Sequence, residues 1–336
     1  ENSCFLILSL FPCGSLKTNS PHMVLQKGVK DMSGGLKTWK RDFRHCWQMW
    51  ILLLPALIWL VVFCYTPMYG LLITFKDYKA NLGILGSPWA GLKYFRQFFE
   101  TDIAFTSIVN TIRISGFSLL FSFPIPILFA LMLNQISSSK VRKFLQSVSF
   151  MPYFISAVVL VGMLNIILSP TTGFVNVFLN HFGMGGKMFM TREEYFLPIY
   201  ILSGIWQSMG FNAIVYIAAL TTIDTALYEA ATIDGASKFK QILYIEIPSI
   251  LPTIIVMFIL ATGNMLSVGY EKVYLMQSSL NLSVSEVVST YVYKVGIQSA
   301  QFSFATAVGL FNSVANFLII FVTNAISRRI SDISLF

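Results

Sequence analysis

The sequence contains few charged residues. Asp, Glu, Lys and Arg make up 11% of its 336 residues, whereas 55% are hydrophobic. A soluble globular domain has about 25% charged residues, so we expect a membrane protein. The formal net charge of +8 then points to anionic lipid headgroups and to orientation in the membrane. Nucleic acid is not an expected partner, because the sequence has no cluster of basic residues interleaved with aromatics.

Catalytic and metal-binding patterns are also missing. The four cysteines include no CxxC pair, and none is spaced from a histidine as metal ligands are. The three histidines, His22, His45 and His181, all lie outside the apolar runs. The P-loop G-x-x-x-x-G-K-[ST] is absent, since methionine follows the pair Gly186 and Lys187. The sequence therefore predicts a non-catalytic chain that binds no cofactor or metal of its own.

Acidic residues are absent from the centres of the apolar runs. Ion-coupled secondary transporters commonly place carboxylates at mid-membrane, where they carry protons or sodium. Their absence argues against an ion-coupled secondary transporter or a channel, which is the main alternative function. A polytopic membrane enzyme is the third alternative, and it would need a nucleophile–base or metal constellation.

Six apolar runs are long enough to cross a bilayer, which takes about 20 mostly apolar residues. They are residues 49–75, 103–133, 144–168, 197–220, 249–268 and 302–326. The runs do not alternate between apolar and polar residues, so the expected fold is all-α with six transmembrane helices. Pro124 and Pro126 predict a kink in the second run, because proline removes backbone donors.

Lysine and arginine are distributed unequally between the two sides of these helices. Fourteen of them fall before the first run, after the second and fourth runs, and after the sixth. Seven in the opposite loops are Lys76, Lys79, Lys93, Arg96, Lys187, Arg192 and Lys294. Because cytoplasmic loops are enriched in Lys and Arg, both termini are predicted to be cytoplasmic. The opposite loops, roughly 25 to 30 residues long, are either a platform for an external partner or packed caps over the bundle.

Three parts are expected along the chain. Residues 1–48 are a flexible cytoplasmic tail, residues 49–327 form the transmembrane domain, and residues 328–336 are a second cytoplasmic tail. The short apolar stretch CFLILSLF near the N-terminus is too short to span a bilayer. We therefore expect the first 22 residues to be flexible, or to be an extension upstream of a true start at Met23 or Met32.

A polar segment, residues 221–248, separates the fourth and fifth runs and predicts a helix-turn-helix. Gly235 marks the turn, because glycine accepts the left-handed conformation that ends a helix. Pro248 stands at the entry to the next run, where a missing N–H costs little. Small alanines let a helix sink into a groove on a partner. The candidate docking residues are Glu229, Ala230, Ala231, Asp234, Gly235 and Ala236.

The pattern EAATIDGASKFKQILYIEIP resembles the cytoplasmic EAA signature of binding-protein-dependent ABC importer permeases. That signature is E-A-A-x-x-x-G followed by a second helix with a terminal proline. The preceding run, with Trp206, Gly210, Phe211 and Asn212, resembles the sugar-importer branch of maltose and oligosaccharide type. The resemblance covers runs two to six. Asp224 departs from it, since many sugar permeases have proline after the isoleucine at this place.

The resemblance implies a permease subunit in the plasma membrane of a bacterium, importing oligosaccharides by alternating access. It also implies several partners: a second permease subunit, two ATPase subunits that bind ATP and Mg²⁺, and an extracytoplasmic solute-binding protein. The ATPase would dock on the helix-turn-helix. The sequence leaves open whether the permease pair is a homodimer or a heterodimer.

Polar residues inside the apolar runs are candidates for the substrate pathway. Most are amides, which donate and accept hydrogen bonds as sugar hydroxyls do, but amides also join helices to one another. Arg113 is the one basic residue deep in a run, and it could attract an acidic sugar or pair inside the bundle. The candidates are Asn110, Arg113, Asn165, Gln207, Asn212, Asn264, Asn312 and Asn316.

Overall fold

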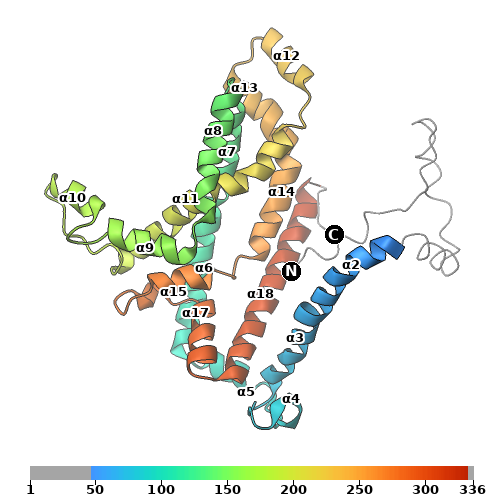
Figure 1. Ribbon diagram of the computed structural model, residues 1–336, viewed down its shortest axis with the longest axis vertical. Helices are drawn as coiled ribbons and strands as arrows, with labels where there is room; N and C mark the ends of the chain where they lie inside the picture. The colour runs from blue at the N-terminus through green and yellow to red at the C-terminus, as the bar shows by residue number, and fades with distance from the viewer. Residues whose placement is uncertain (1–46, 332–336) are drawn as a thin grey trace. The chain divides into compact units, whose positions relative to one another are not determined.

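The computed structural model describes residues 47–331, which fall into two units, one ending at Gly70 and one beginning at Leu71 (Figure 1). These residues are nearly all helical, and their only strand pairing is an isolated bridge between Lys76 and Trp89. The all-α class predicted from the sequence is confirmed.

Most of the two predicted tails lies outside the described residues. Residues 1–46, with the candidate starts Met23 and Met32, lie outside the described residues, and so do residues 332–336. The predicted C-terminal tail begins at Arg328, but the last described helix continues as far as Ser331.

The first unit contains most of the first apolar run. Its helical segments are α2 (Trp47–Trp59), the π-helical η2 (Leu60–Tyr65) and α3 (Thr66–Met68). The 3-10 helix η3 (Tyr69–Phe75) begins in this unit and ends in the second. The apolar window of the span Trp50–Phe75 has no buried residue. Such a surface is expected of a helix that meets lipid or another subunit.

The second unit contains the remaining elements. In chain order they are α4 (Gly83–Gly86), α5 (Lys93–Phe99), α6 (Asp102–Ser122), α7 (Pro124–Asn134), α8 (Ser139–Phe150), η4 (Met151–Phe154), α9 (Ala157–Ile167), α10 (Phe174–Asn180), α11 (Glu193–Leu220), α12 (Thr225–Ile233), α13 (Lys238–Gln241), η5 (Ile242–Glu246), α14 (Ile247–Gly263), α15 (Tyr270–Met276), α16 (Leu282–Ser285), α17 (Val288–Tyr293), η6 (Lys294–Gln298) and α18 (Phe302–Ser331).

Five helices in the described residues are long and apolar enough to cross a membrane, or six if one bent pair counts as a span. The five are Trp50–Phe75, Asp102–Asn134, Glu193–Leu220, Lys238–Gly263 and Phe302–Arg329. The second span is interrupted at Phe123, directly before Pro124, where the kink was predicted.

The third predicted span, residues 144–168, is not one continuous helix. Ser139–Phe154 and Ala157–Ile167 are bent by 98° relative to each other. The chain becomes extended at Ile155, and the Ser156 hydroxyl accepts a hydrogen bond from the backbone N–H of Val159 at 3.3 Å, which caps the new helix. Hydropathy missed this corner because both arms are apolar.

The fifth span differs from its prediction at both ends. It begins at Lys238 inside the polar segment and runs through η5 into α14 as one helical rod. It ends at Gly263 rather than at residue 268, and residues 264–269 form a turn. The second helix of the helix-turn-helix is thus the first part of a membrane span.

The segment between the fifth and sixth spans is packed into the bundle. Val273, Met276 and Val287 are buried in one cluster with Ile114 of α6 and Phe196 of α11. The opposite loops were expected to be either a platform for an external partner or packed caps over the bundle. The loop between the fifth and sixth spans is a packed cap.

Candidate functional site

The polar segment forms the predicted helix-turn-helix. The Asp224 carboxylate accepts a hydrogen bond from the backbone N–H of Ala226 at 2.9 Å and so caps the start of α12. At the other end, Gly235 has φ +70°, and the N–H of Ala236 donates to the carbonyl of Ala231 at 2.8 Å. Asp224, which departs from the family pattern, is therefore the N-cap of this helix.

The helix-turn-helix projects from the bundle, and α12 lies at the end of the second unit near α7, α8 and α13 (Figure 1). No residue of α12 is buried. Large apolar side chains are exposed along the segment, notably Ile233 (86%), Phe239 (72%) and Tyr244 (73%). Glu229 and Ala230 are exposed beside them. A projecting segment with uncovered apolar side chains is typical of a protein contact surface.

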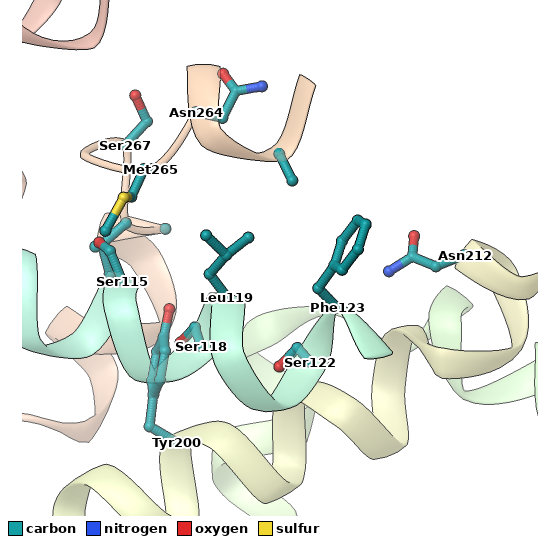
Figure 2. A pocket seen from close by; sticks show the side chains of 13 residues that line it. Ser115, Ser118, Leu119, Ser122, Phe123, Tyr200, Asn212, Asn264, Met265 and Ser267 are labelled. Carbon is teal, nitrogen blue, oxygen red and sulfur yellow. The ribbon is translucent and has the colours of Figure 1, made fainter. Parts of the chain in front are cut away.

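A cavity of about 290 Å³ lies inside the second unit, between α6, α11 and the end of α14 (Figure 2). Ser118, halfway along the Asp102–Asn134 span, is one of the residues on its wall. The lining residues are Ser115, Ser118, Leu119, Ser122, Phe123, Tyr200, Asn212, Ala261, Asn264, Met265, Ser267, Val268 and Gly269.

Three serines of α6 are among the lining residues. Ser115, Ser118 and Ser122 follow at helical spacing on α6 and share a face. The hydroxyls of Ser115 and Ser118 are buried and have no hydrogen-bond partner among the described residues. These serines were missed in the sequence, although their three- and four-residue spacing is a signal that could have found them.

Another part of the cavity wall is the turn that follows the fifth span. The turn of residues 264–269 faces Leu119 and Phe123 of α6 (Figure 2). Non-helical backbone at membrane depth is tolerated where it lines a cavity and its polar groups have partners. Asn316 of α18 supplies two of these partners: its Oδ1 accepts from the N–H of Leu266 at 2.9 Å, and its Nδ2 donates to the Ser267 hydroxyl at 3.0 Å.

The structure separates the predicted pathway amides into different surroundings. Asn212 and Asn264 line the cavity. Asn110, Gln207 and Asn312 donate to backbone carbonyls of other elements, and Asn165 is exposed on α9. The acceptors are Ser283 and Glu286 for Asn110, Ile155 for Gln207 and Leu266 for Asn312.

Arg113 lines a second cavity of about 630 Å³. The side chain of Arg113 is exposed, and it belongs to no ion pair within residues 47–331. On the same wall Arg192 pairs with Glu194 at 3.3 Å, and Glu193 accepts a hydrogen bond from a serine hydroxyl. Arg113 is thus free to meet an anion or a partner subunit.

The sequence matches a known family over residues 122–332, described as "Binding-protein-dependent transport system inner membrane component". Two proteins of Bacillus subtilis (strain 168) are similar over most of their length. The "Polygalacturonan/rhamnogalacturonan transport system permease protein YteP" is 38% identical over 284 residues, which cover 84% of this chain and 88% of YteP. "Protein LplB" is 37% identical over 320 residues, which cover 95% of this chain and 98% of LplB.

Solved structures give the same result. A chain in the crystal structure of a bacterial ABC transporter involved in the import of the acidic polysaccharide alginate is 41% identical, with a TM-score of 0.81. The match covers 88% of this chain and 99% of that chain. In the complex of the alginate transporter with its alginate pentasaccharide-bound periplasmic protein, the corresponding values are 40% and 0.80. The chain therefore belongs to the family of binding-protein-dependent transport system inner membrane components, and it is the permease component of an ABC sugar importer.

Proposed function

We propose that this chain forms half of the translocation pathway and passes the motion of separate ATPase subunits to the membrane through α12. One observation carries the proposal: the second helix of the docking segment continues as the membrane helix that ends at the cavity. A partner that moves the segment also moves the cavity wall. The contact would be made by the six docking residues, with Glu229 facing a basic group of the ATPase.

The proposed assembly contains a second permease subunit, two ATPase subunits and an external solute-binding protein. ATP and Mg²⁺ are bound by the ATPases, since this sequence has no P-loop. The similar transporter that binds a periplasmic protein supports the external partner. The exposed faces of the spans support a second permease, because a lone chain leaves them uncovered.

Both termini and the docking segment are proposed to be cytoplasmic. The distribution of lysine and arginine supports this orientation, and adding Lys272 to the opposite side makes the count fourteen to eight. Single cysteines at Ser237 and Met184, introduced into a chain without its native four, test it with an impermeant reagent. Met184 should be labelled from outside the cell and Ser237 only after lysis; the reverse pattern would contradict the orientation.

The cavity is proposed to be a sugar subsite on the pathway. Its lining includes the amides Asn212 and Asn264, and each neutral hydrogen bond that such a group offers contributes only about 0.5–1.5 kcal/mol. Weak contacts of this kind suit a conduit that must release its cargo. Selection then falls mainly to the external binding protein.

The substrate is proposed to be an acidic oligosaccharide. The names of the similar proteins support this class, since one carries polygalacturonan and the other imports the acidic polysaccharide alginate. In this chain, the unpaired Arg113 supplies a guanidinium group that can pair with a carboxylate. Titration of the cognate binding protein with uronate oligosaccharides and with neutral oligosaccharides of equal length tests the class. Preference for the neutral sugars would reject it.

The decisive experiment for the energy source is uptake into proteoliposomes that contain the whole transporter. We expect uptake to need ATP and the binding protein, and to survive an ionophore that dissipates ion gradients. Uptake that continues without ATP and stops with the ionophore would assign the chain to ion-coupled transport instead.

A further inference from the structure

Glu246 is a buried carboxylate beside the docking helix. It lies in η5, the π-helical segment that joins α13 to α14, and it is 0% exposed. No ion pair includes it among residues 47–331. A buried carboxylate without a cation partner is destabilising unless hydrogen-bond donors replace the lost water.

Three donors converge on one oxygen of this carboxylate. Glu246 Oε1 accepts hydrogen bonds from Asn134 Nδ2 at 2.6 Å, from Gln135 Nε2 at 2.8 Å and from the Tyr228 hydroxyl at 3.2 Å. Asn134 and Gln135 stand at the end of α7, whereas Tyr228 belongs to α12. One side chain of the fifth span therefore joins the docking helix to the end of the second span.

Little else holds α12 in place. None of its residues is buried. In the described part of the chain its other side-chain links to neighbouring elements are two long hydrogen bonds, from Asn134 Nδ2 to the Tyr228 hydroxyl at 3.4 Å and from Gln241 Nε2 to the Thr232 hydroxyl at 3.3 Å. Burial, with the negative charge of Glu246, raises the pKa of Tyr228 to about 12. The Tyr228 hydroxyl therefore remains protonated, and able to donate, at physiological pH.

A purely stabilising role fits Glu246 poorly. Its second oxygen, Oε2, is buried and has no hydrogen-bond partner in residues 47–331. An apolar side chain of similar size at this position would avoid the cost of burying a charge. What an apolar side chain would not do is hold Tyr228, Asn134 and Gln135 together.

We propose that Glu246 is a positioning residue for transport, the polar link through which movement of α12 reaches α7 and α14. The inference rests on the proposed docking of the ATPase to α12. When α12 moves, the three hydrogen bonds carry both membrane helices with it. Without them α12 pivots on its exposed connections, and ATP is hydrolysed without moving the pathway.

Four variants separate this role from a structural one. Glu246→Met removes the link together with the buried charge, while Glu246→Gln keeps an oxygen that accepts the same donors. Tyr228→Phe removes the hydroxyl on α12, which donates to Glu246 and accepts from Asn134 Nδ2 at 3.4 Å. Ser249→Ala is the matched control, because the exposed Ser249 hydroxyl bonds only to the carbonyl of Ile245 in its own helix.

The experiment compares the assembled transporter, with its partner subunits and binding protein, in proteoliposomes. It measures saccharide taken up per ATP hydrolysed, and the melting temperature of the complex. We expect Glu246→Met to lower this ratio at least tenfold while the melting temperature stays the same or rises. Glu246→Gln should stay within threefold of the unaltered transporter, and Ser249→Ala should match it. Tyr228→Phe should lower the ratio, and its effect should be smaller in the Glu246→Met background than in the unaltered transporter.

Two results would overturn the inference. The first is an unchanged ratio in Glu246→Met. The second is a fall in melting temperature and in the amount of complex with the ratio preserved, which would make Glu246 a structural residue. Pull-down of the ATPase keeps the two proposals apart. If Glu246→Met retains ATPase binding but couples normally, only this inference fails. If docking-segment variants leave ATPase binding intact, the proposed function itself fails.

Discussion

The ammonium group of Lys272 lies on Tyr200. Lys272 Nζ donates a hydrogen bond to the Tyr200 carbonyl oxygen at 2.9 Å and is 4.7 Å from the centre of the Tyr200 ring. Gly204, one turn further along α11, leaves room for it, since a Cβ there would come within 3.3 Å of Nζ. Lys272 lies on α15, outside the membrane spans, and burial lowers its pKa to about 8.

This shift predicts a pH dependence of stability. Between pH 8 and 10.5 the folded chain has lost the Lys272 proton while the unfolded chain keeps it. Because the unfolded state then binds more protons, the free energy of unfolding rises with pH, by at most about 1.4 kcal/mol per unit. Below pH 8 both states are protonated, and this contribution is constant.

The difference in melting temperature between the unaltered chain and Lys272→Met measures the effect. The difference should be constant from pH 6 to 7.5 and move in favour of the unaltered chain from pH 8 to 10. Lys140→Met, on the surface of α8, controls for the loss of a positive charge. A difference that is flat over the whole range would contradict the prediction.

The turn of the docking segment depends on Gly235. Its φ of +70° is costly for a residue with a branched Cβ, so Gly235→Val should strain the turn by about 1–2 kcal/mol. We expect the variant to insert normally but to recover at least fivefold less ATPase in a pull-down. Gly162→Ala is the control, because a Cβ at Gly162 on α9 meets open space without positive φ. Wild-type recovery and uptake with Gly235→Val would show that the turn is not needed for docking.

Uptake should depend on the volume of the cavity between α6, α11 and the end of α14. Ser118→Phe places an aromatic ring at the wall of the cavity of about 290 Å³. We expect uptake to fall at least tenfold while ATPase binding and complex yield stay within twofold. Ser313→Phe serves for comparison, because the Ser313 hydroxyl is exposed and bonds within α18. Equal uptake by the two variants would remove the cavity from the pathway.

Asn316 should act on stability rather than on selectivity. Asn316→Ala removes two hydrogen bonds that hold the turn of residues 264–269, which is a loss of about 1–3 kcal/mol. Thermal unfolding should show the loss, whereas the relative uptake of different saccharides should not change. Asn165→Ala, at an exposed position, should leave both unchanged. A change of saccharide preference in Asn316→Ala would place it in contact with cargo.

Hydropathy was enough to locate the spans, because lipid requires long apolar helices wherever they pack. It could not reveal the corner at Ile155, where a local cap and the amide of Gln207 redirect an apolar chain. The docking motif was recognisable because its short-range pattern builds the turn at Gly235. The roles of Asn264 and Asn316 could not be recognised in the sequence. Their side chains are chemically identical, and they differ only in the groups that the fold brings next to them. Glu246 was interpreted only as part of a polar segment. Its burial depends on α7, which is distant in the sequence.

The rod Lys238–Gly263 makes the membrane part of the transporter a lever. At 1.5 Å per residue, its 26 residues span roughly 39 Å, so a tilt of about 10° about one end displaces the other by roughly 7 Å. One end carries the docking segment, and the other carries the wall with Asn264. In the proposed mechanism, rotation of this rod about a point between its ends would turn a movement of the docking segment into a movement of the cavity wall.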